Sequence, residues 1–125
     1  MPEIMVWQRE KVQSRFEEAH AREMTSQDYA AWAAIRSLGE AVTRTNAADV
    51  ETLRAYILSD AFELAAFKGQ KVTFRQWNGQ LRQPILLYDD RITVSVSPQE
   101  GFLHQRSPLD TMGLDAPESD CTAFQ

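Results

Sequence analysis

Proline and glycine divide this sequence of 125 residues into two parts of different character. Residues 3–60 contain no proline and a single glycine, Gly39, whereas residues 67–125 hold four of the five prolines and four of the five glycines. Both residue types disfavour the interior of a helix and favour turns. The first part is therefore predicted to be helical, and the second to consist of strands, turns and irregular backbone.

The strongest predicted helix spans about residues 26–44. Thr25 can cap its first turn while Asp28 reaches back to the cap, which is a capping-box pattern. Apolar residues then recur at helical spacing and would bury one face of the helix. These residues are Ala31, Ala34, Ile35, Leu38 and Val42.

Two further helices are predicted over about residues 9–21 and 48–58. The second of them has Asn46 or Asp49 available as its N-terminal cap. It would turn an apolar set inward, namely Val50, Leu53 and Ile57.

Strands are predicted over about residues 71–77, 81–88 and 92–96. Asn78-Gly79 lies between the first two and favours a two-residue type I′ hairpin, because both residues tolerate a positive φ. After Pro98 few apolar residues recur at regular spacing. We therefore expect an α/β domain over residues 1–97 and an irregular tail over 98–125, lying on a surface.

Three helices, a hairpin and one more strand do not make a convincing closed fold. The helical faces need a sheet to cover them, and the strands are few, antiparallel and late in the chain. We interpret the chain as an incomplete portion of a larger α/β body. In that case the face formed by Ala31, Ile35 and Leu38 would be exposed and would bind a hydrophobic dye.

Composition limits the possible partners. The formal net charge of -5 and the pI near 5.0 disfavour nucleic acids and anionic membrane surfaces. No stretch approaches the roughly 20 apolar residues that span a bilayer. Residues 1–10 lack the basic start and apolar core of a secretory signal. Cys121 is the only cysteine, so no disulfide can close within this chain.

No catalytic set is apparent, and we expect neither an enzyme nor a cofactor. The two histidines, His20 and His104, lie in different halves, and we interpret the first as a solvated helix residue and the second as structural. Asp89-Asp90 could be imagined as a metal pair, but neighbouring acids in a turn usually cap it. We therefore expect no metal site.

Aromatic and arginine side chains are the remaining candidates for ligand contact. Tyr29 could line a flat ligand together with tryptophans, although core packing is the commoner role for such residues. Arg75 and Arg82 flank the predicted hairpin and could clamp a carboxylate, although exposed strand arginines are commoner. The tryptophans are Trp7, Trp32 and Trp77.

Several runs of this sequence resemble the late part of type I periplasmic solute-binding proteins, the branched-chain amino-acid binding proteins of ABC transporters. The runs that carry the resemblance are 15–19, 28–35 and 67–74. Three others are similar to the subgroup associated with pyrroloquinoline-quinone (PQQ)-dependent alcohol dehydrogenases, and they are more specific. They are FRQWNGQLRQP at 74–84, GFLH at 101–104 and LDTMG at 109–113.

The resemblance implies a non-catalytic binding protein that captures a small solute between two lobes. The parent protein would be periplasmic, would deliver its solute to an ABC permease, and would be connected with PQQ-dependent alcohol oxidation. The present chain would supply part of one lobe and the crossing toward the other. Tyr29 and Trp32 are the candidate ligand contacts, although Trp32-Ala33-Ala34 stands where most relatives have Tyr-Asp-Ala.

Two alternatives remain open at this point. The first is a non-transport sensor or accessory protein of a quinoprotein dehydrogenase system. The second is an independent small interaction domain. Genes for a permease and an ATPase beside this one would favour transport, whereas a dehydrogenase gene alone would favour the accessory role.

Overall fold

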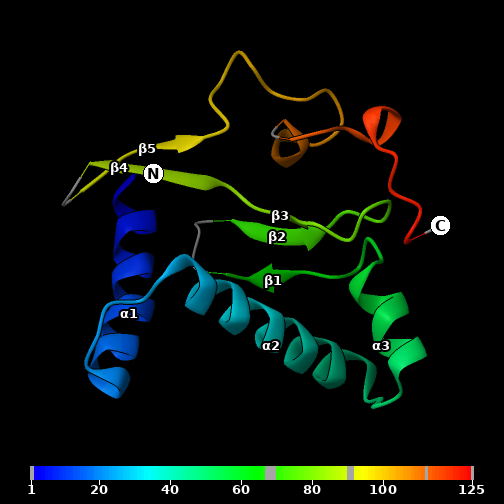
Figure 1. The fold of residues 1–125 in the computed structure, drawn as a ribbon, viewed down its shortest axis with the longest axis horizontal. Helices are drawn as coiled ribbons and strands as arrows, with labels where there is room; N and C mark the ends of the chain where they lie inside the picture. The colour runs from blue at the N-terminus through cyan, green and yellow to red at the C-terminus, as the bar shows by residue number, and fades with distance from the viewer. Residues whose placement is uncertain (1, 67–69, 90–91, 112, 125) are drawn as a thin grey trace. The chain divides into compact units, whose positions relative to one another are not determined.

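The computed structural model describes residues 2–66, 70–89, 92–111 and 113–124. Within these ranges the chain is a small mixed helix-and-sheet protein with a few antiparallel strands (Figure 1). It divides into two compact units, Met1–Thr73 and Phe74–Gln125. The first unit contains the helices α1 (Pro2–His20), α2 (Ser26–Thr45) and α3 (Val50–Ile57) and the strand β1 (Leu64–Ala65). None of the described helices is long and apolar enough to cross a membrane.

The start of α2 confirms the predicted capping box. The Thr25 hydroxyl accepts the N–H of Asp28 at 3.3 Å, and the Asp28 carboxylate accepts the N–H of Thr25 at 2.9 Å. At the other end Asn46 takes a left-handed conformation with φ of 52°, and its N–H donates to the carbonyl of Val42. Two local signals therefore fix both ends of this helix.

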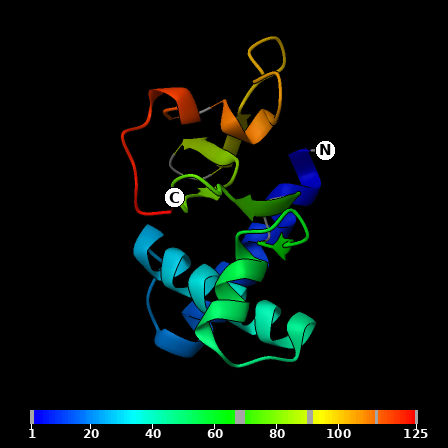
Figure 2. The same cartoon turned by 90° about the vertical axis from the view of Figure 1, so that its right-hand side faces the viewer.

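The buried face of α2 is not the predicted one. Small residues, Ala33, Ser37 and Ala41, are buried, and α2 contacts α3 and β1 (Figure 2). The larger apolar side chains of Ile35 and Leu38, predicted to be buried, are 69% and 47% exposed. Small side chains let a helix approach its neighbours closely. The stripe of small residues therefore forms the packing face of α2.

The other two helices follow the prediction in position but not in every detail. α1 begins at Pro2 instead of about residue 9, and proline is well suited to a first helical turn. α3 is capped by Asp49, whose carboxylate accepts the N–H of Thr52 at 2.8 Å. Val50, predicted to point inward, is 80% exposed. In the first turn of a short helix its side chain projects into solvent, whereas Leu53 and Ile57 are half-buried.

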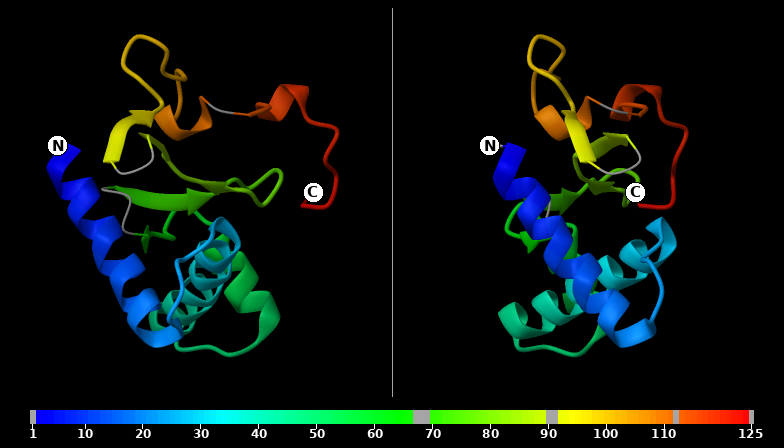
Figure 3. Two further views of the ribbon diagram at one scale, coloured as in Figure 1. Left: turned by 60° about the vertical axis from the view of Figure 1, so that its left-hand side comes forward. Right: turned by 90° about the vertical axis from the view of Figure 1, so that its left-hand side faces the viewer.

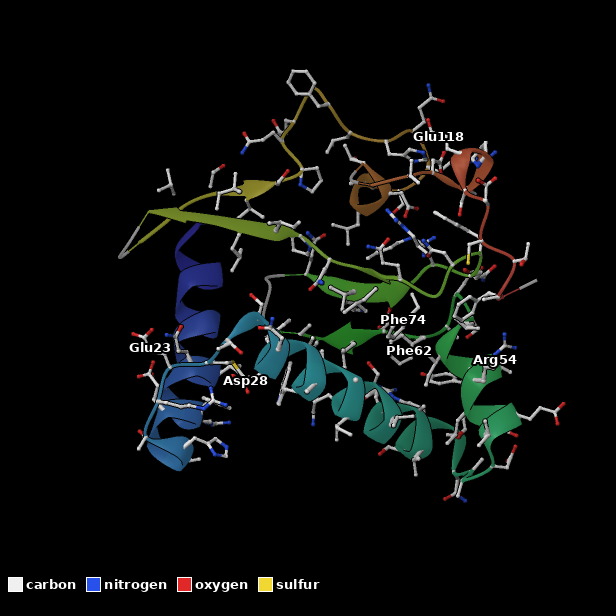
Figure 4. All side chains as sticks on the ribbon, in the orientation of Figure 1. Glu23, Asp28, Arg54, Phe62, Phe74 and Glu118 are labelled. Atoms are coloured by element: carbon white, nitrogen blue, oxygen red, sulfur yellow. The ribbon has the colours of Figure 1, made fainter. Side chains whose placement is uncertain are left out.

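An apolar core holds the first unit together. β1 pairs antiparallel with β2 (Lys71–Phe74), and Leu64 lies opposite Val72. Both side chains are buried, as is that of Phe62, whose ring meets the ring of Tyr56 edge-on with centroids 5.8 Å apart (Figure 4). Burial of a ring of this size contributes about 1.5–3 kcal/mol.

The hairpin loop at the start of the second unit differs from the predicted type I′ turn. Gly79 has a positive φ of 69°, but Asn78 does not. The N–H of Gly79 donates to the carbonyl of Arg75, and the N–H of Arg75 donates to the carbonyl of Gln80. The loop is therefore four residues long, from Gln76 to Gly79. The Asn78 side chain accepts the N–H of Gln80, which stabilises this longer turn.

The strands of the second unit are β3 (Leu81–Arg82), β4 (Ile85–Asp89) and β5 (Ile92–Ser97). The single strand predicted over 81–88 is interrupted at Gln83-Pro84, because proline cannot donate to a ladder. β4 and β5 lie side by side (Figure 3) and pair antiparallel with Leu86 opposite Val96, and the register shifts between Leu87 and Tyr88.

Residues 98–124 do not form a tail that merely lies on a surface. The described part of this segment contains two 3-10 helices, Pro108–Asp110 and Ala116–Glu118. Leu109 and Asp110 are buried. The ring of Phe124 lies so close to Gly79 that a methyl group at Gly79 would overlap it. The segment is thus held against the hairpin of its own unit.

Candidate functional site

The most enclosed polar cluster of the described chain joins Arg75 and Arg82 to Asp110. Arg75 Nε donates to Asp110 Oδ1 at 2.7 Å, and Arg82 Nε lies 2.8 Å from Oδ1 and 2.9 Å from Oδ2. The exposed fractions of the three side chains are 3%, 21% and 9%. The two arginines flanking the hairpin therefore do clamp a carboxylate, and that carboxylate belongs to the chain itself.

Other groups of the hairpin orient the two guanidiniums. Arg75 Nη1 donates to Gln80 Oε1 at 2.6 Å, and its guanidinium carbon lies 5.3 Å from the centroid of the Trp77 ring. Arg82 Nη1 donates to the carbonyl of Phe74 at 3.0 Å. Each arginine thus has a second hydrogen bond and does not depend on Asp110 alone for its direction.

The electrostatics of the cluster favour an ionised Asp110. Burial by itself raises the pKa of this carboxyl, but the hydrogen bonds from Arg82 and Arg75 outweigh it and hold the pKa below its ordinary value. Two guanidiniums converge on one carboxylate in a largely enclosed place. The carboxylate held in this way is a poor proton acceptor, because protonation would cost it the attraction of both arginines.

His104 forms a second polar cluster, with Asp115. Nδ1 accepts the backbone N–H groups of Arg106 at 3.1 Å and Ser107 at 3.3 Å. The proton of the neutral ring is therefore assigned to Nε2, which lies 3.2 Å from Asp115 Oδ2. The N–H of Ala116 and then this imidazole hold the pKa of Asp115 below its ordinary value.

This arrangement gives His104 the structural role that the sequence indicated. Both ring nitrogens take part in hydrogen bonds that shape the segment around them. The backbone N–H of His104 also donates to the Thr111 hydroxyl at 2.8 Å. A histidine with this set of partners organises a loop and has no nitrogen directed at a reacting group.

The two candidate ligand contacts, Tyr29 and Trp32, are neighbours on α2. Their ring centroids are 5.6 Å apart, and both side chains are half-buried. The Tyr29 hydroxyl donates to the carbonyl of Ala66 at 2.6 Å, and burial raises its pKa to about 12. The hydrogen bond connects α2 to the residue that follows β1. The Tyr29 hydroxyl therefore has a structural role in the first unit.

The other candidates are distributed differently. Trp77 lies against Arg75 in the second unit, and the side chain of Trp7 lies outside the described part of the structure. Asp90 and the side chain of Asp89 also lie outside it. Among the residues that were described, no group of three or more metal-binding side chains was found. His20 is exposed, and its ring lies tilted against that of Phe16 with centroids 4.5 Å apart.

A further ion pair joins the end of α1 to the start of α2. Arg22 Nη1 and Nη2 lie 2.7 and 2.8 Å from the two oxygens of Asp28. This bidentate pair, and then the Thr25 hydroxyl and N–H, hold the pKa of Asp28 well below its ordinary value. The pair is exposed, so its contribution is local and depends on salt.

Sequence reasoning missed Asp110 as the partner of the two arginines. Asp110 lies 35 residues from Arg75 and 28 from Arg82, and no periodic pattern connects positions so far apart. The available signal was the pair of arginines itself, which predicted a carboxylate partner without indicating which one.

Comparison with protein-family models, with curated proteins and with solved structures finds no match to this chain.

Proposed function

We propose that this chain is part of the ligand-binding body of a type I periplasmic solute-binding protein, the solute-capturing component of an ABC-type transporter. The solute would be small and similar to a branched-chain amino acid, and the system would be linked to PQQ-dependent alcohol oxidation. The sequence runs described above support the family. The observation in the structure that carries the proposal is the exposed apolar face that α2 presents beside its buried face.

One face of α2 packs within the first unit, and a second face of the same helix is apolar and exposed. Ala33, Ser37 and Ala41 are buried, whereas Ile35, Leu38 and Val42 are 43% exposed or more. Exposed apolar area costs about 25 cal/mol per Å² compared with buried area. A helix that buries one face and carries apolar residues on a second is typical of an α/β body in which helices lie between other layers.

The polar clusters support binding in preference to catalysis. Arg75, Arg82 and Asp110 satisfy one another, and His104 is engaged through both nitrogens. In a solute-binding protein the chemistry is recognition followed by closure of two lobes, which makes and breaks no covalent bond. Tyr29 and Trp32 remain the candidate ligand contacts of this proposal.

An antibody against residues 99–111 tests the proposal on the protein as the source organism produces it. We expect the antibody to detect a periplasmic polypeptide much larger than 14.3 kDa. After immunopurification, this polypeptide should gain thermal stability from a small aliphatic amino acid, acid or alcohol. A product of 14.3 kDa confined to the cytoplasm would overturn the proposal.

The same purification separates transport from the alternative role. A co-purifying permease and ATPase would indicate an importer. A co-purifying quinoprotein dehydrogenase without a permease would indicate a sensor or accessory protein. Substitution of Trp32 by leucine should weaken the ligand-induced stabilisation if Trp32 contacts the solute, whereas substitution of Trp77 provides the matched control.

A further inference from the structure

Arg75 and Arg82 present three N–H···O contacts to one small space of the second unit. The contacts involve Arg75 Nε with Oδ1 and Arg82 Nε with both oxygens of Asp110, at 2.7 to 2.9 Å. Each arginine directs its Nε–H at Asp110, and that of Arg82 reaches both oxygens, an arrangement that a planar carboxylate fits better than a spherical anion does. The shape of this space therefore selects a carboxylate.

The arginines are held in place by contacts that do not involve Asp110. Gln80 Oε1 accepts Arg75 Nη1, the Trp77 ring lies beside the same guanidinium, and the carbonyl of Phe74 accepts Arg82 Nη1. All three partners lie within residues 74–82, the hairpin that carries the arginines. The donors should therefore remain directed at the same space when the Asp110 side chain is removed.

Burial makes an anion in this space necessary. Arg75 is 3% exposed, and two cations converge there. A buried cation without its counter-ion is strongly destabilising, because it has lost water and no opposite charge compensates for that loss. The missing carboxylate would leave a void lined by cations and about the size of an acetate ion.

We propose that Arg75 and Arg82 form a carboxylate-binding site whose resident ligand is Asp110, and that a free small carboxylate occupies the site when the Asp110 side chain is absent. The occupied site fastens the segment 98–124 to the hairpin. This inference concerns the second unit alone and does not depend on the proposed transport function.

The variant Asp110→Gly tests the site, with acetate and formate as probes. In chloride buffer we expect the thermal midpoint to fall by about 10 °C and deuterium exchange of the described parts of 98–124 to accelerate about 10-fold. Acetate at about 10–100 mM should restore at least half of both losses. A concentration well above about 1 mM is needed, because the Asp110 carboxylate is tethered to the chain and has a high effective concentration, whereas a free ion does not.

Matched controls separate a specific site from a general effect of salt. Chloride at equal ionic strength should give no recovery, and neither should acetate added to Asp115→Gly, which removes the carboxylate beside His104. In the double variant Asp110→Gly, Arg82→Met the response to acetate should disappear. Equal recovery with chloride, or in the double variant, would overturn the proposal.

A second measurement applies if Asp110→Gly does not fold in chloride. The variant is then refolded from urea in acetate or in chloride, and we expect a several-fold higher yield of folded protein in acetate. Asp110→Asn, which keeps the shape and removes the charge, should also accelerate exchange in 98–124. No advantage from acetate in refolding, or unchanged exchange in the asparagine variant, would contradict the proposal.

Discussion

The interior of each of the two units is stabilised by a different kind of contact. The interior of the first unit is apolar and includes Phe62, Leu64 and Val72, packed by helices that satisfy their own backbone hydrogen bonds. In the second unit two of the buried side chains, Arg75 and Asp110, are charged. Its C-terminal segment is mostly irregular and relies on side chains for hydrogen bonds that a helix would make internally.

This difference shows what each kind of sequence needs in order to fold. A helix needs a cap and one face of suitable size, and many residues fulfil these requirements. An irregular segment needs particular partners at particular distances, and a single substitution can remove them. We therefore expect the first unit to respond to changes in side-chain volume and the second to changes in charge, turn geometry and hydrogen bonding.

A matched pair of phenylalanine substitutions tests the apolar side of this comparison and should give the largest effect. Phe62→Ala removes a fully buried ring and should lower the free energy of unfolding by about 3–5 kcal/mol. Phe102→Ala, at a position that is 80% exposed in the second unit, should change it by less than about 0.5 kcal/mol. Urea denaturation followed by circular dichroism measures both changes in the free energy of unfolding. Equal changes would contradict the conclusion that buried apolar side chains stabilise the first unit more than apolar side chains stabilise the second.

Two glycine substitutions test the importance of close approach in the second unit. Gly79 and Gly101 both have positive φ, 69° and 88°, so alanine at either site should cost about 1–2 kcal/mol in strain. A methyl group at Gly79 also overlaps the Phe124 ring, which should add about 1–3 kcal/mol. Space around Gly101 is open. Adding Phe124→Ala should recover part of the loss at Gly79 and none at Gly101, as measured by urea denaturation.

The two faces of α2 can be compared by a pair of substitutions that hardly change helix propensity. Ala41→Leu overfills the fully buried face and should cost about 1–3 kcal/mol. Leu38→Gln, on the exposed face, should change stability by less than about 0.5 kcal/mol and reduce the binding of a hydrophobic dye. A large loss of stability from Leu38→Gln would show that this face is covered within the folded chain.

The smallest effect is expected for the single polar tie between α2 and the β1 segment. Tyr29→Phe removes the hydrogen bond to the carbonyl of Ala66 and should cost about 1 kcal/mol. Burial raises the Tyr29 pKa to about 12, so its stabilisation is complete below its ordinary pKa near 10. That stabilisation is lost as the pH rises from 10 toward 12. Stability of the phenylalanine variant should therefore fall less over this range, as measured by denaturation at each pH.

Local signals in the sequence predicted the helical part well. Thr25 and Asp28 predicted the start of α2, and Asp49 was one of two residues expected to cap α3. The buried face of α2 could not be predicted in the same way. Hydrophobic periodicity identifies the bulkiest apolar stripe, whereas packing here selected the stripe that permits close approach, Ala33 to Ala41.

The second unit was less predictable because its decisive contacts are distant in the sequence. Asn78-Gly79 correctly indicated a turn, but its length depends on the hydrogen bonds of Arg75 with Gly79 and Gln80. The positions of Arg75 and Arg82 beside the hairpin indicated that they could bind a carboxylate. No local sequence pattern indicated that this carboxylate is Asp110. Irregular segments are specified by such long-range pairs, which a single sequence does not reveal.

The contact between Phe124 and Gly79 also provides an intrinsic reporter for nuclear magnetic resonance. Circulating π electrons shift nearby protons, and the α proton of Gly79 that occupies the direction of a Cβ points at the Phe124 ring. Glycine has two such protons, so unequal shielding should separate their resonances widely when the C-terminal segment is docked. When the segment detaches, the two resonances should converge, and docking could be followed in solution without attaching any probe.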